Sequence, residues 1–277
     1  CPHATIRPFA LTAEEAKNAP EAAKIVDVKA GKGKGTYQFT MAISPLDCMG
    51  CGVCIGACPV NALSMVAQEG ELKQQDVFDY CMDKVSEKKD MQDNTVKGSQ
   101  FKQPMLEFSG SCAGCAETSY ARLVTQLFGD RMYISNATGC SSIWGGPAAT
   151  SPYTVNKESG HGPAWANSLF EDNAEHGFGM YLGQKVIRDN TIAKIEALKA
   201  AKPELAEVID AFLATKNSTK ENTPAAEALI AALEKDGSAE AKEILENKQF
   251  LAKKSIWIFG GDGWAYDIGQ IGRASCR

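Results

Sequence analysis

The 277-residue sequence contains no apolar run approaching the 18 or more residues of a membrane-spanning helix, so nothing in it predicts a membrane span. Basic stretches of the kind that bind nucleic acid are also missing, and the formal net charge is −5. Histidine is scarce, at three residues, and neither His161 nor His176 has a partner at a spacing that supports acid–base catalysis. What the sequence does contain is ten cysteines, most of them in closely spaced groups.

The first group is Cys48-Met-Gly-Cys51-Gly-Val-Cys54-Ile-Gly-Ala-Cys58-Pro59. This is the C-x2-C-x2-C-x3-C-P run of bacterial ferredoxin-type sites, in which three cysteines of one loop hold three corners of a [4Fe–4S] cluster. The fourth cysteine, followed by proline, ligates the other cluster in two-cluster ferredoxins. The run therefore predicts that the chain transfers electrons.

Cys1-Pro2 matches the end of a second such run, whose other cysteines we expect upstream of this sequence. The ligand exchange of two-cluster ferredoxins then assigns Cys1 to one cluster together with Cys48, Cys51 and Cys54, and Cys58 to the other. Cysteines used as cluster ligands favour a reducing compartment over a disulfide framework. On this ground we expect a cytoplasmic protein.

Composition divides the chain into segments. We expect an iron–sulfur module over 1–85, a polar linker over 86–104 and an α/β domain over 105–270, with three or four amphipathic helices inserted at about 184–250. Residues 271–277 are compatible with a sequencing adapter translated in frame, and we exclude them, with Cys276, from the chemistry.

Four local patterns make finer predictions. Residues 36–43 alternate as a strand does. Residues 255–259 form an apolar run that predicts a fully buried strand of a parallel sheet, followed by a glycine-rich loop at the edge where open α/β sheets bind ligands. Pro203 suits a first helical turn, and Thr223 suits an N-cap before Pro224.

The second cysteine group is Cys112-Ala-Gly-Cys115, followed by Cys140. Three interpretations remain open from the residues alone: a redox disulfide, half of a zinc site, or part of a further [4Fe–4S] cluster. A fourth ligand is not evident. Cys81 is the one unassigned candidate, and we expect it to be a buried free thiol.

The triplet Gly261-Asp262-Gly263 has the chemistry of a diphosphate site. Glycines let the backbone approach a phosphate, and the aspartate can ligate a Mg²⁺ that bridges to phosphate oxygens. Such a triplet is more often only a turn. Its position after an apolar strand favours the diphosphate interpretation.

Six stretches together resemble pyruvate:ferredoxin (flavodoxin) oxidoreductase over nearly the whole chain. They are Cys1–Ala4 with Arg7-Pro8, the Cys48–Pro59 run, Phe108–Thr118, Asn136–Gly146, Gly162–Glu175, and the loop Gly260–Gly269. The resemblance implies an α+β ferredoxin-like two-[4Fe–4S] module followed by an α/β thiamine diphosphate-binding domain with a helical insertion. It also implies thiamine diphosphate, Mg²⁺, coenzyme A and three [4Fe–4S] clusters.

Site residues follow from the resemblance position by position. Cys112, Cys115 and Cys140 match ligands of the cluster nearest thiamine. Glu117 and Cys140 match positions that contact thiamine diphosphate, and Gly261, Asp262, Gly263 and Trp264 match its diphosphate loop, with Asp262 as the Mg²⁺ ligand. The fourth cluster ligand, the other Mg²⁺ ligands and the activating glutamate have no counterpart here, so no catalytic residue is assigned and the isolated chain is expected to be inactive.

The resemblance implies oxidative decarboxylation of pyruvate with coenzyme A to acetyl-CoA and CO2, with ferredoxin or flavodoxin as electron acceptor and a homodimer as the intact enzyme. Two alternatives stay open: a pure electron-transfer module, and an oxidoreductase for another 2-oxo acid. Substrate specificity, the choice of acceptor and the direction of reaction are not encoded in recognisable residues.

The assignment of cysteines predicts the outcome of reconstitution. Iron and sulfide added to the 277-residue chain should give one complete ferredoxin-type cluster, on Cys1, Cys48, Cys51 and Cys54, because Cys58 would have no partners for a second. Iron and sulfide analysis with electron paramagnetic resonance (EPR) checks this. Two complete ferredoxin-type clusters per chain would contradict the assignment.

Overall fold

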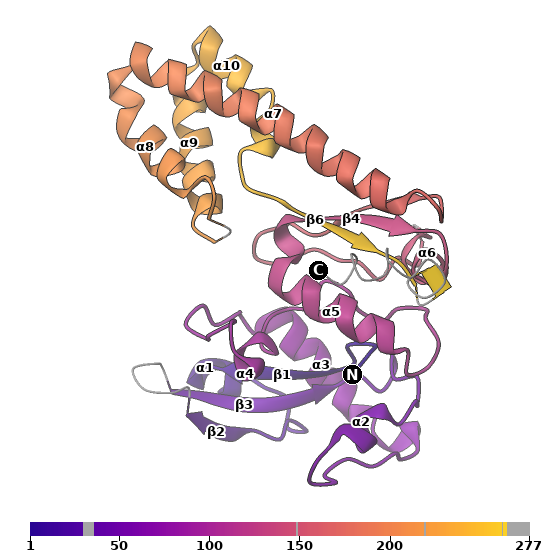
Figure 1. Cartoon of the computed structure of the whole chain (residues 1–277). Coiled ribbons are helices and arrows are strands. Elements are labelled where there is room, and N and C mark those ends of the chain that lie inside the picture. Colours follow the sequence, from indigo (N-terminus) through magenta and orange to yellow (C-terminus); the bar gives the residue numbers. More distant parts are fainter. Residues whose placement is uncertain (30–35, 148, 219, 262, 265–277) are drawn as a thin grey trace. The chain divides into compact units, whose positions relative to one another are not determined.

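The computed structural model describes residues 1–29, 36–147, 149–218, 220–261 and 263–264 (Figure 1). The chain forms two compact units. The first comprises 1–130 with 140–163, and the second comprises 131–139 with 164–277. These contact-defined units divide the chain elsewhere than at the expected linker, so the expected domain boundaries remain a prediction. Among the described residues, no helix is both long and apolar enough to cross a membrane.

The first unit is built on an antiparallel sheet of three strands in the order β1-β3-β2 (Figure 1). Its strands are β1 (Ile6–Leu11), β2 (Val26–Lys29) and β3 (Thr36–Ile43). The strand predicted over 36–43 is confirmed with these bounds. Strands β1 and β3 pair from Ile6 opposite Ile43 to Leu11 opposite Gln38.

Helix α3 (Lys73–Lys84) buries one face in the core of this unit. Its buried residues Val77, Phe78 and Cys81 lie on one side of the helix, because Cys81 is four residues from Val77 and three from Phe78. They pack with Leu11 of β1 and Ala42 of β3. The other helices described in the unit are α1 (Ala13–Lys17), α2 (Val53–Ala57), η1 (Gln68–Gly70), α4 (Val96–Ser99), α5 (Ala116–Phe128) and α6 (Cys140–Gly145).

The second unit contains a parallel sheet in the order β5-β4-β6, as predicted for an α/β domain. Its strands are β4 (Met132–Ala137), β5 (Ala164–Ser168) and β6 (Ser255–Phe259); η2 (Gly129–Arg131) precedes β4. The expectation that 255–259 is fully buried is wrong, because every residue of β6 is only half-buried. The physical reason is its place at the edge of the three described strands, whereas β4 lies at the centre.

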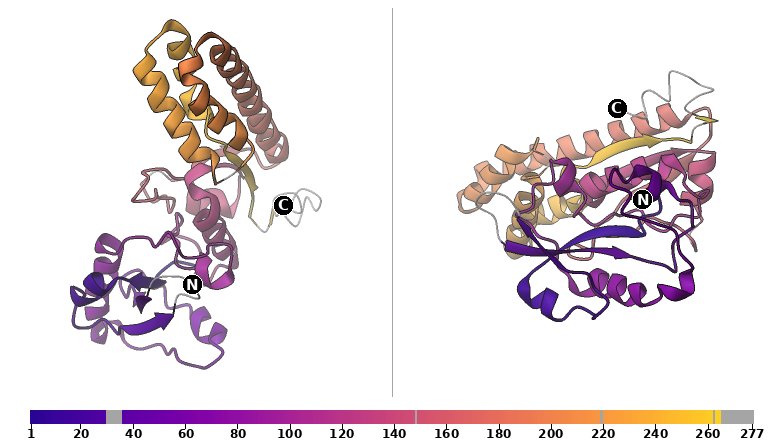
Figure 2. Two further views of the ribbon diagram at one scale, coloured as in Figure 1. Left: turned by 90° about the vertical axis from the view of Figure 1, so that its left-hand side faces the viewer. Right: turned by 90° about the horizontal axis from the view of Figure 1, so that it is seen from below.

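Between β5 and β6 the described residues form four α-helices, in agreement with the three or four helices predicted; Figure 2 shows them side by side. They are α7 (Asn173–Ala201), α8 (Ala206–Thr215), α9 (Asn222–Asp236) and α10 (Ala239–Leu245), with η3 (Pro203–Leu205) and η4 (Lys248–Phe250) as short connections. Their apolar faces form a core that includes Ile195, Ile209, Phe212, Leu229 and Leu233, each fully buried.

Two helix boundaries test the sequence patterns. Pro203 begins η3 at its first position, as predicted. The expectation that Thr223 caps α9 is wrong, because the helix already includes Asn222. Asn222 is fully buried, and its side-chain oxygen accepts hydrogen bonds from the Lys253 amide (2.7 Å) and the Arg188 guanidinium (3.3 Å). These tertiary contacts fix the first turn of the helix.

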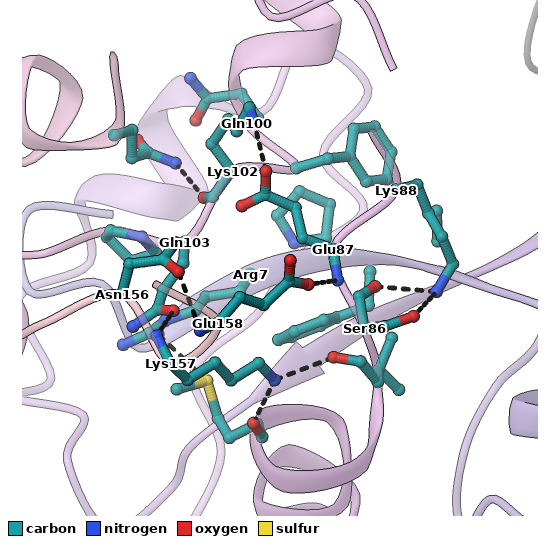
Figure 3. Close-up of a pocket in the computed structure, with 18 of the residues that line it drawn as sticks. Arg7, Ser86, Glu87, Lys88, Gln100, Lys102, Gln103, Asn156, Lys157 and Glu158 are labelled. Atoms are coloured by element: carbon teal, nitrogen blue, oxygen red, sulfur yellow. Dashed lines mark hydrogen bonds and ion pairs between the residues drawn. The ribbon is translucent and has the colours of Figure 1, made fainter. Parts of the chain in front are cut away.

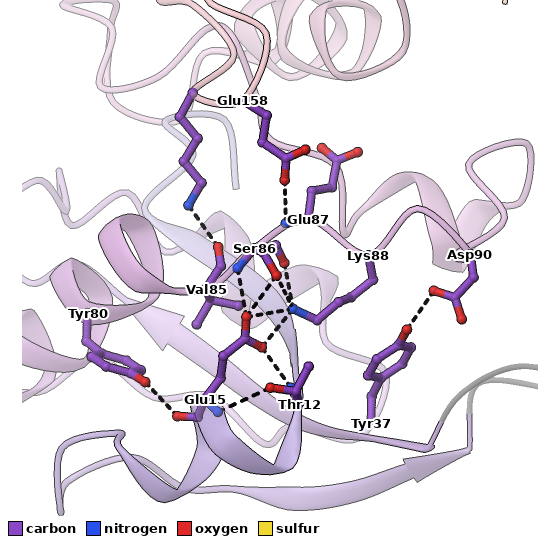
Figure 4. A network of polar contacts seen from close by, with 11 residues as sticks. Thr12, Glu15, Tyr37, Tyr80, Val85, Ser86, Glu87, Lys88, Asp90 and Glu158 are labelled. Atoms are coloured by element: carbon purple, nitrogen blue, oxygen red, sulfur yellow. Dashed lines mark hydrogen bonds and ion pairs between the residues drawn. The ribbon is translucent and has the colours of Figure 1, made fainter.

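The polar segment 86–104, expected to be a linker, is packed onto the first unit by a network around Glu15 (Figure 4). Lys88 is buried and contacts both carboxylate oxygens of Glu15, at 2.9 and 2.7 Å. Ser86 and Thr12 donate backbone N–H groups to the same carboxylate. Burial opposes ionisation of Glu15, but the hydrogen bonds from Lys88, Ser86 and Thr12 outweigh it and lower the pKa to about 2.

This pKa predicts how stability depends on pH. Glu15 is more acidic in the folded chain than its ordinary value of 4.5, so its stabilisation is complete above pH 4.5 and is lost as the pH falls towards 2. Lys88→Met should lower the free energy of unfolding at pH 7 and weaken its decline between pH 5 and 3. Urea unfolding at several pH values measures this, with the exposed neighbour variant Lys89→Met as control. An identical pH profile for Lys88→Met and the parent chain would contradict the assignment.

Candidate iron–sulfur and cofactor sites

The first cysteine group lies in an open loop that leads into α2. Gly50 and Gly52 have φ of 67° and 72°, in the left-handed region that side chains disfavour, so glycine lets the loop turn tightly between the cysteines. Cys48 is exposed, and Cys51, Cys54 and Cys58 are half-buried. These four cysteines are not in disulfides, which leaves the group available for ligation.

Backbone donors surround the last cysteine of the run. The Ala62 amide donates to the Cys58 sulfur at 3.3 Å. This hydrogen bond, helped by the Val60 amide, lowers the pKa of Cys58 and favours the thiolate. The thiolate is the form that binds iron, and N–H···S hydrogen bonds are one means by which proteins adjust iron–sulfur potentials. The donor chemistry of the loop therefore fits a [4Fe–4S] cluster.

The structure leaves the grouping of the cysteines into clusters as a prediction. Among the described residues, no three or more His, Cys, Asp or Glu side chains lie close enough together to hold a single metal ion. Cys1 is half-buried, with its sulfur 3.2 Å from the Thr5 hydroxyl. Cys81 is buried and free, as expected, and burial raises the pKa of its thiol to about 12.

The second cysteine group forms a tight turn immediately before α5. The Cys115 amide donates to the Cys112 carbonyl at 3.0 Å, and Cys115 occupies the N-cap position. Cys112 is exposed, and so is Cys140, which opens α6 in the same unit. The turn lies against the first group, because a Cβ added to Gly114 would be 3.4 Å from the Cys51 Cβ. Two of the predicted sites are therefore in contact.

Glu117 lies in the first turn of α5 and is half-buried. Burial raises the pKa of Tyr153, and the negative charge of Glu117 raises it further, which places the carboxylate within electrostatic reach of that phenol. Both residues belong to the first unit. The expected contact of Glu117 with thiamine diphosphate remains a prediction.

The glycine-rich loop after β6 is described on both sides of Asp262, which itself lies outside the described residues. Trp264 is only 1% exposed, and its indole N–H donates to the Phe170 carbonyl at 2.8 Å. A Cβ at Gly260 would be 2.0 Å from the Trp264 ring, so this position accepts only glycine. Trp264 was expected to contact the cofactor; its buried ring holds the loop backbone, and a contact with cofactor remains a prediction. Gly261 is buried and Gly263 exposed.

Asn173, which the sequence analysis did not single out, joins the carboxyl ends of all three parallel strands. It is fully buried at the start of α7. Its carboxamide oxygen accepts from the hydroxyls of Ser135 in β4 (2.7 Å) and Ser168 in β5 (2.9 Å), and its amide donates to the Phe259 carbonyl of β6 at 2.7 Å. Because Phe259 directly precedes the glycine-rich loop, Asn173 fixes where that loop begins.

His176 completes this polar group, with its Nδ1 2.7 Å from the Ser135 hydroxyl. Gly177 follows it, and a Cβ there would lie 2.5 Å from Ile258 Cγ1, so glycine lets α7 approach the sheet closely. A buried asparagine carries no sequence signal of its own. The only hint was its place in the stretch Gly162–Glu175 that carried the family resemblance.

A pocket in the first unit contains none of the predicted site residues (Figure 3). Several of its charged groups have partners: Lys102 pairs with Glu87, and Glu158 accepts from the Glu87 amide at 3.0 Å. Lys157 donates to the carbonyls of Met82 (2.5 Å) and Val85 (2.8 Å). These bonds attach 100–104 and 156–158 to the end of α3, so the pocket has a structural explanation.

The role of Asn173 is testable through stability. Asn173→Ala should lower the free energy of unfolding by about 2–4 kcal/mol, because each buried polar group left without a partner costs roughly 1–3 kcal/mol. Denaturant unfolding followed by circular dichroism measures the change. Asn190→Ala, at an exposed position of the same helix, is the control and should be nearly neutral. Equal stability of the two variants would show that Asn173 does not hold the strand ends.

Comparison with known proteins supports the assignment of the first cysteine group to an iron–sulfur site. A family model described as a 4Fe-4S binding domain matches residues 41–64. The chain is 48% identical to a pyruvate-flavodoxin oxidoreductase of Klebsiella pneumoniae, over 97% of this chain and 23% of that protein. It is 47% identical to a pyruvate:ferredoxin oxidoreductase of Moorella thermoacetica, over 98% of this chain and 24% of that protein.

A third relative, a pyruvate dehydrogenase [NADP(+)] of Cryptosporidium parvum, is 41% identical over 98% of this chain and 16% of its own length. The chain thus spans about a quarter or less of the length of these relatives. Over nearly its whole length, the chain is homologous to an internal segment of the pyruvate-flavodoxin and pyruvate:ferredoxin oxidoreductases.

Proposed function

We propose that the chain is the part of a pyruvate:ferredoxin (flavodoxin) oxidoreductase that holds [4Fe–4S] clusters and begins the thiamine diphosphate site. The whole protein would convert pyruvate and coenzyme A to acetyl-CoA and CO2, release one proton and pass two electrons to ferredoxin or flavodoxin. One observation carries the proposal: similarity at 48% identity extends over 97% of the chain, and so includes both cysteine groups and the glycine-rich loop.

The ligand assignments belong to the proposal. One cluster takes Cys1, Cys48, Cys51 and Cys54; Cys58 serves a second, and Cys112, Cys115 and Cys140 serve the one nearest thiamine. When bound, these groups supply one-electron transfer, and thiamine diphosphate supplies the carbanion chemistry. The chain's own contribution is to hold thiolates, to donate backbone N–H groups such as that of Ala62, and to fix the diphosphate loop through Asn173 and Trp264.

The thiamine diphosphate site is supported by the placement of its candidate loop. The glycine-rich loop follows β6 at the carboxyl edge of a parallel sheet, where open α/β sheets bind ligands. Within this proposal Asp262 ligates Mg²⁺, Gly261 and Gly263 admit the diphosphate, and Glu117 and Cys140 contact the cofactor. We further propose that the intact enzyme is a homodimer.

The final electron acceptor is the least constrained element of the proposal. Two relatives are named for flavodoxin or ferredoxin, whereas the Cryptosporidium parvum relative is named for NADP(+). The same segment therefore occurs in proteins whose names give different acceptors. We propose ferredoxin or flavodoxin because those relatives have the higher identities.

A chimeric enzyme tests the proposal. The segment of the Klebsiella pneumoniae relative that matches this chain is replaced by residues 1–269, and reduction of flavodoxin is followed with pyruvate and coenzyme A. The chimera should be active. Cys112→Ser should lower its activity at least about 100-fold, since even residues behind metal ligands change activity by roughly 10–100-fold. The isolated chain should show no activity.

Cys81→Ser is the matched control, because Cys81 is buried and is not among the proposed ligands. It should retain activity and the iron content of the chimera. A chimera that folds, binds iron and yet neither binds thiamine diphosphate nor responds to pyruvate would favour a pure electron-transfer module.

A further inference from the structure

His3 lies against the second cysteine group and is almost completely buried, at 2% exposure. Its Nε2 accepts a hydrogen bond from the Gly114 amide at 3.1 Å. Gly114 is one of the two central residues of the Cys112–Cys115 turn, and His3 is two residues from Cys1. A single side chain therefore connects the first residues of the chain to the second cysteine group.

The same turn touches the first cysteine group. A Cβ at Gly114 would lie 3.1 Å from Val53 Cγ2, 3.4 Å from Cys51 Cβ and 3.9 Å from the Cys51 sulfur. Gly114 has φ of 77°, so glycine is required for its backbone as well as for the approach. The turn thus rests directly on the loop that carries Cys51.

A second hydrogen bond fixes the position of His3. Its carbonyl accepts from the Phe108 amide at 3.0 Å, four residues before Cys112. The residues on both sides of this bond, Ala4 and Phe108, have positive φ of 56° and 51°. Non-glycine residues adopt such angles only where surrounding contacts determine them, and they concentrate at functional sites.

The hydrogen bond defines the tautomer of His3. A nitrogen that accepts from an amide carries no proton, so the proton lies on Nδ1. The role of hydrogen-bond acceptor therefore requires a neutral imidazole.

We infer that His3 is a positioning residue: its imidazole accepts the Gly114 N–H and holds the Cys112–Cys115 turn against Cys51. This inference extends the proposed function. Its consequence for electron transfer between the two centres rests on that proposal. The centre on Cys112 and Cys115 lies beside the cluster on Cys48, Cys51 and Cys54, and His3 maintains the short path between them.

Hydrogen exchange tests the positioning without any cofactor. In the 277-residue chain, His3→Ala should speed exchange of the Gly114 amide about tenfold, the equivalent of one lost hydrogen bond. His3→Gln places an amide oxygen where it can accept the same N–H and should restore most of the protection. His161→Ala, at an exposed histidine of the same unit, is the control and should exchange like the parent. Unchanged protection of Gly114 in His3→Ala would overturn the inference.

EPR of the reduced chimeric enzyme, whose flanking segments supply the cluster ligands that have no counterpart in this chain, tests the consequence. Magnetic interaction between two neighbouring centres should broaden the parent spectrum; His3→Ala should narrow it and His3→Gln should preserve it. Loss of Gly114 protection in His3→Ala with no change in this broadening would overturn the role of His3 between the centres. A single isolated cluster in every variant would count against the proposed function, while hydrogen exchange still decides the role of His3.

Glycine variants test the contact between the two cysteine loops without changing His3. Gly114→Ala must displace the turn, because its Cβ meets Val53 and Cys51 in a left-handed backbone. Gly110→Ala, in the same segment, meets nothing within 4 Å. Gly114→Ala should narrow the spectrum as His3→Ala does, and Gly110→Ala should leave it unchanged. The opposite pattern would contradict the contact between the two cysteine loops.

Discussion

The buried guanidinium of Arg7 holds the iron–sulfur part of the chain together. It pairs with Glu107, lies 5.2 and 5.3 Å from the ring centroids of Phe78 and Phe108, and donates from Nε to the Ala4 carbonyl at 2.6 Å. Removing one partner of such a buried pair costs about 3–5 kcal/mol, because the other charge is left uncompensated. The contact joins β1, α3 and the residues that lead into the second cysteine group.

In the second unit, the apolar core and the polar residues lie in different places. Its helices α7 to α10 bury a core of aliphatic and aromatic side chains, none of which is a candidate for binding or catalysis. Its polar residues gather instead at the carboxyl ends of the parallel strands, where Asn173 satisfies Ser135, Ser168 and the Phe259 carbonyl. Burying polar groups is favourable only when their partners are complete, so this hub specifies one arrangement of the strand ends. Because the glycine-rich loop begins directly after Phe259, its starting position is set by this arrangement.

Patterns that depend on neighbouring residues were predictable from the sequence, and contacts between distant residues were not. The strand over 36–43, the proline at the start of η3 and the cysteine spacing are local, and each was recognised. The packing of 86–104 depends on Lys88 meeting Glu15, 73 residues away, so its polar composition suggested a linker. Likewise, His3 meets Gly114 across 111 residues, and only the folded chain brings them together. The assignment of Asp262, Cys140 and Glu117 to thiamine diphosphate rests on resemblance.

The central claim is that two iron–sulfur centres lie side by side on the two cysteine groups. Diffraction from crystals of the iron-loaded chain, recorded on both sides of the iron absorption edge, tests it most directly. The account predicts iron density against the sulfurs of Cys48, Cys51 and Cys54, and separate iron density against those of Cys112 and Cys115. A disulfide between Cys112 and Cys115, or zinc in place of iron there, would contradict it.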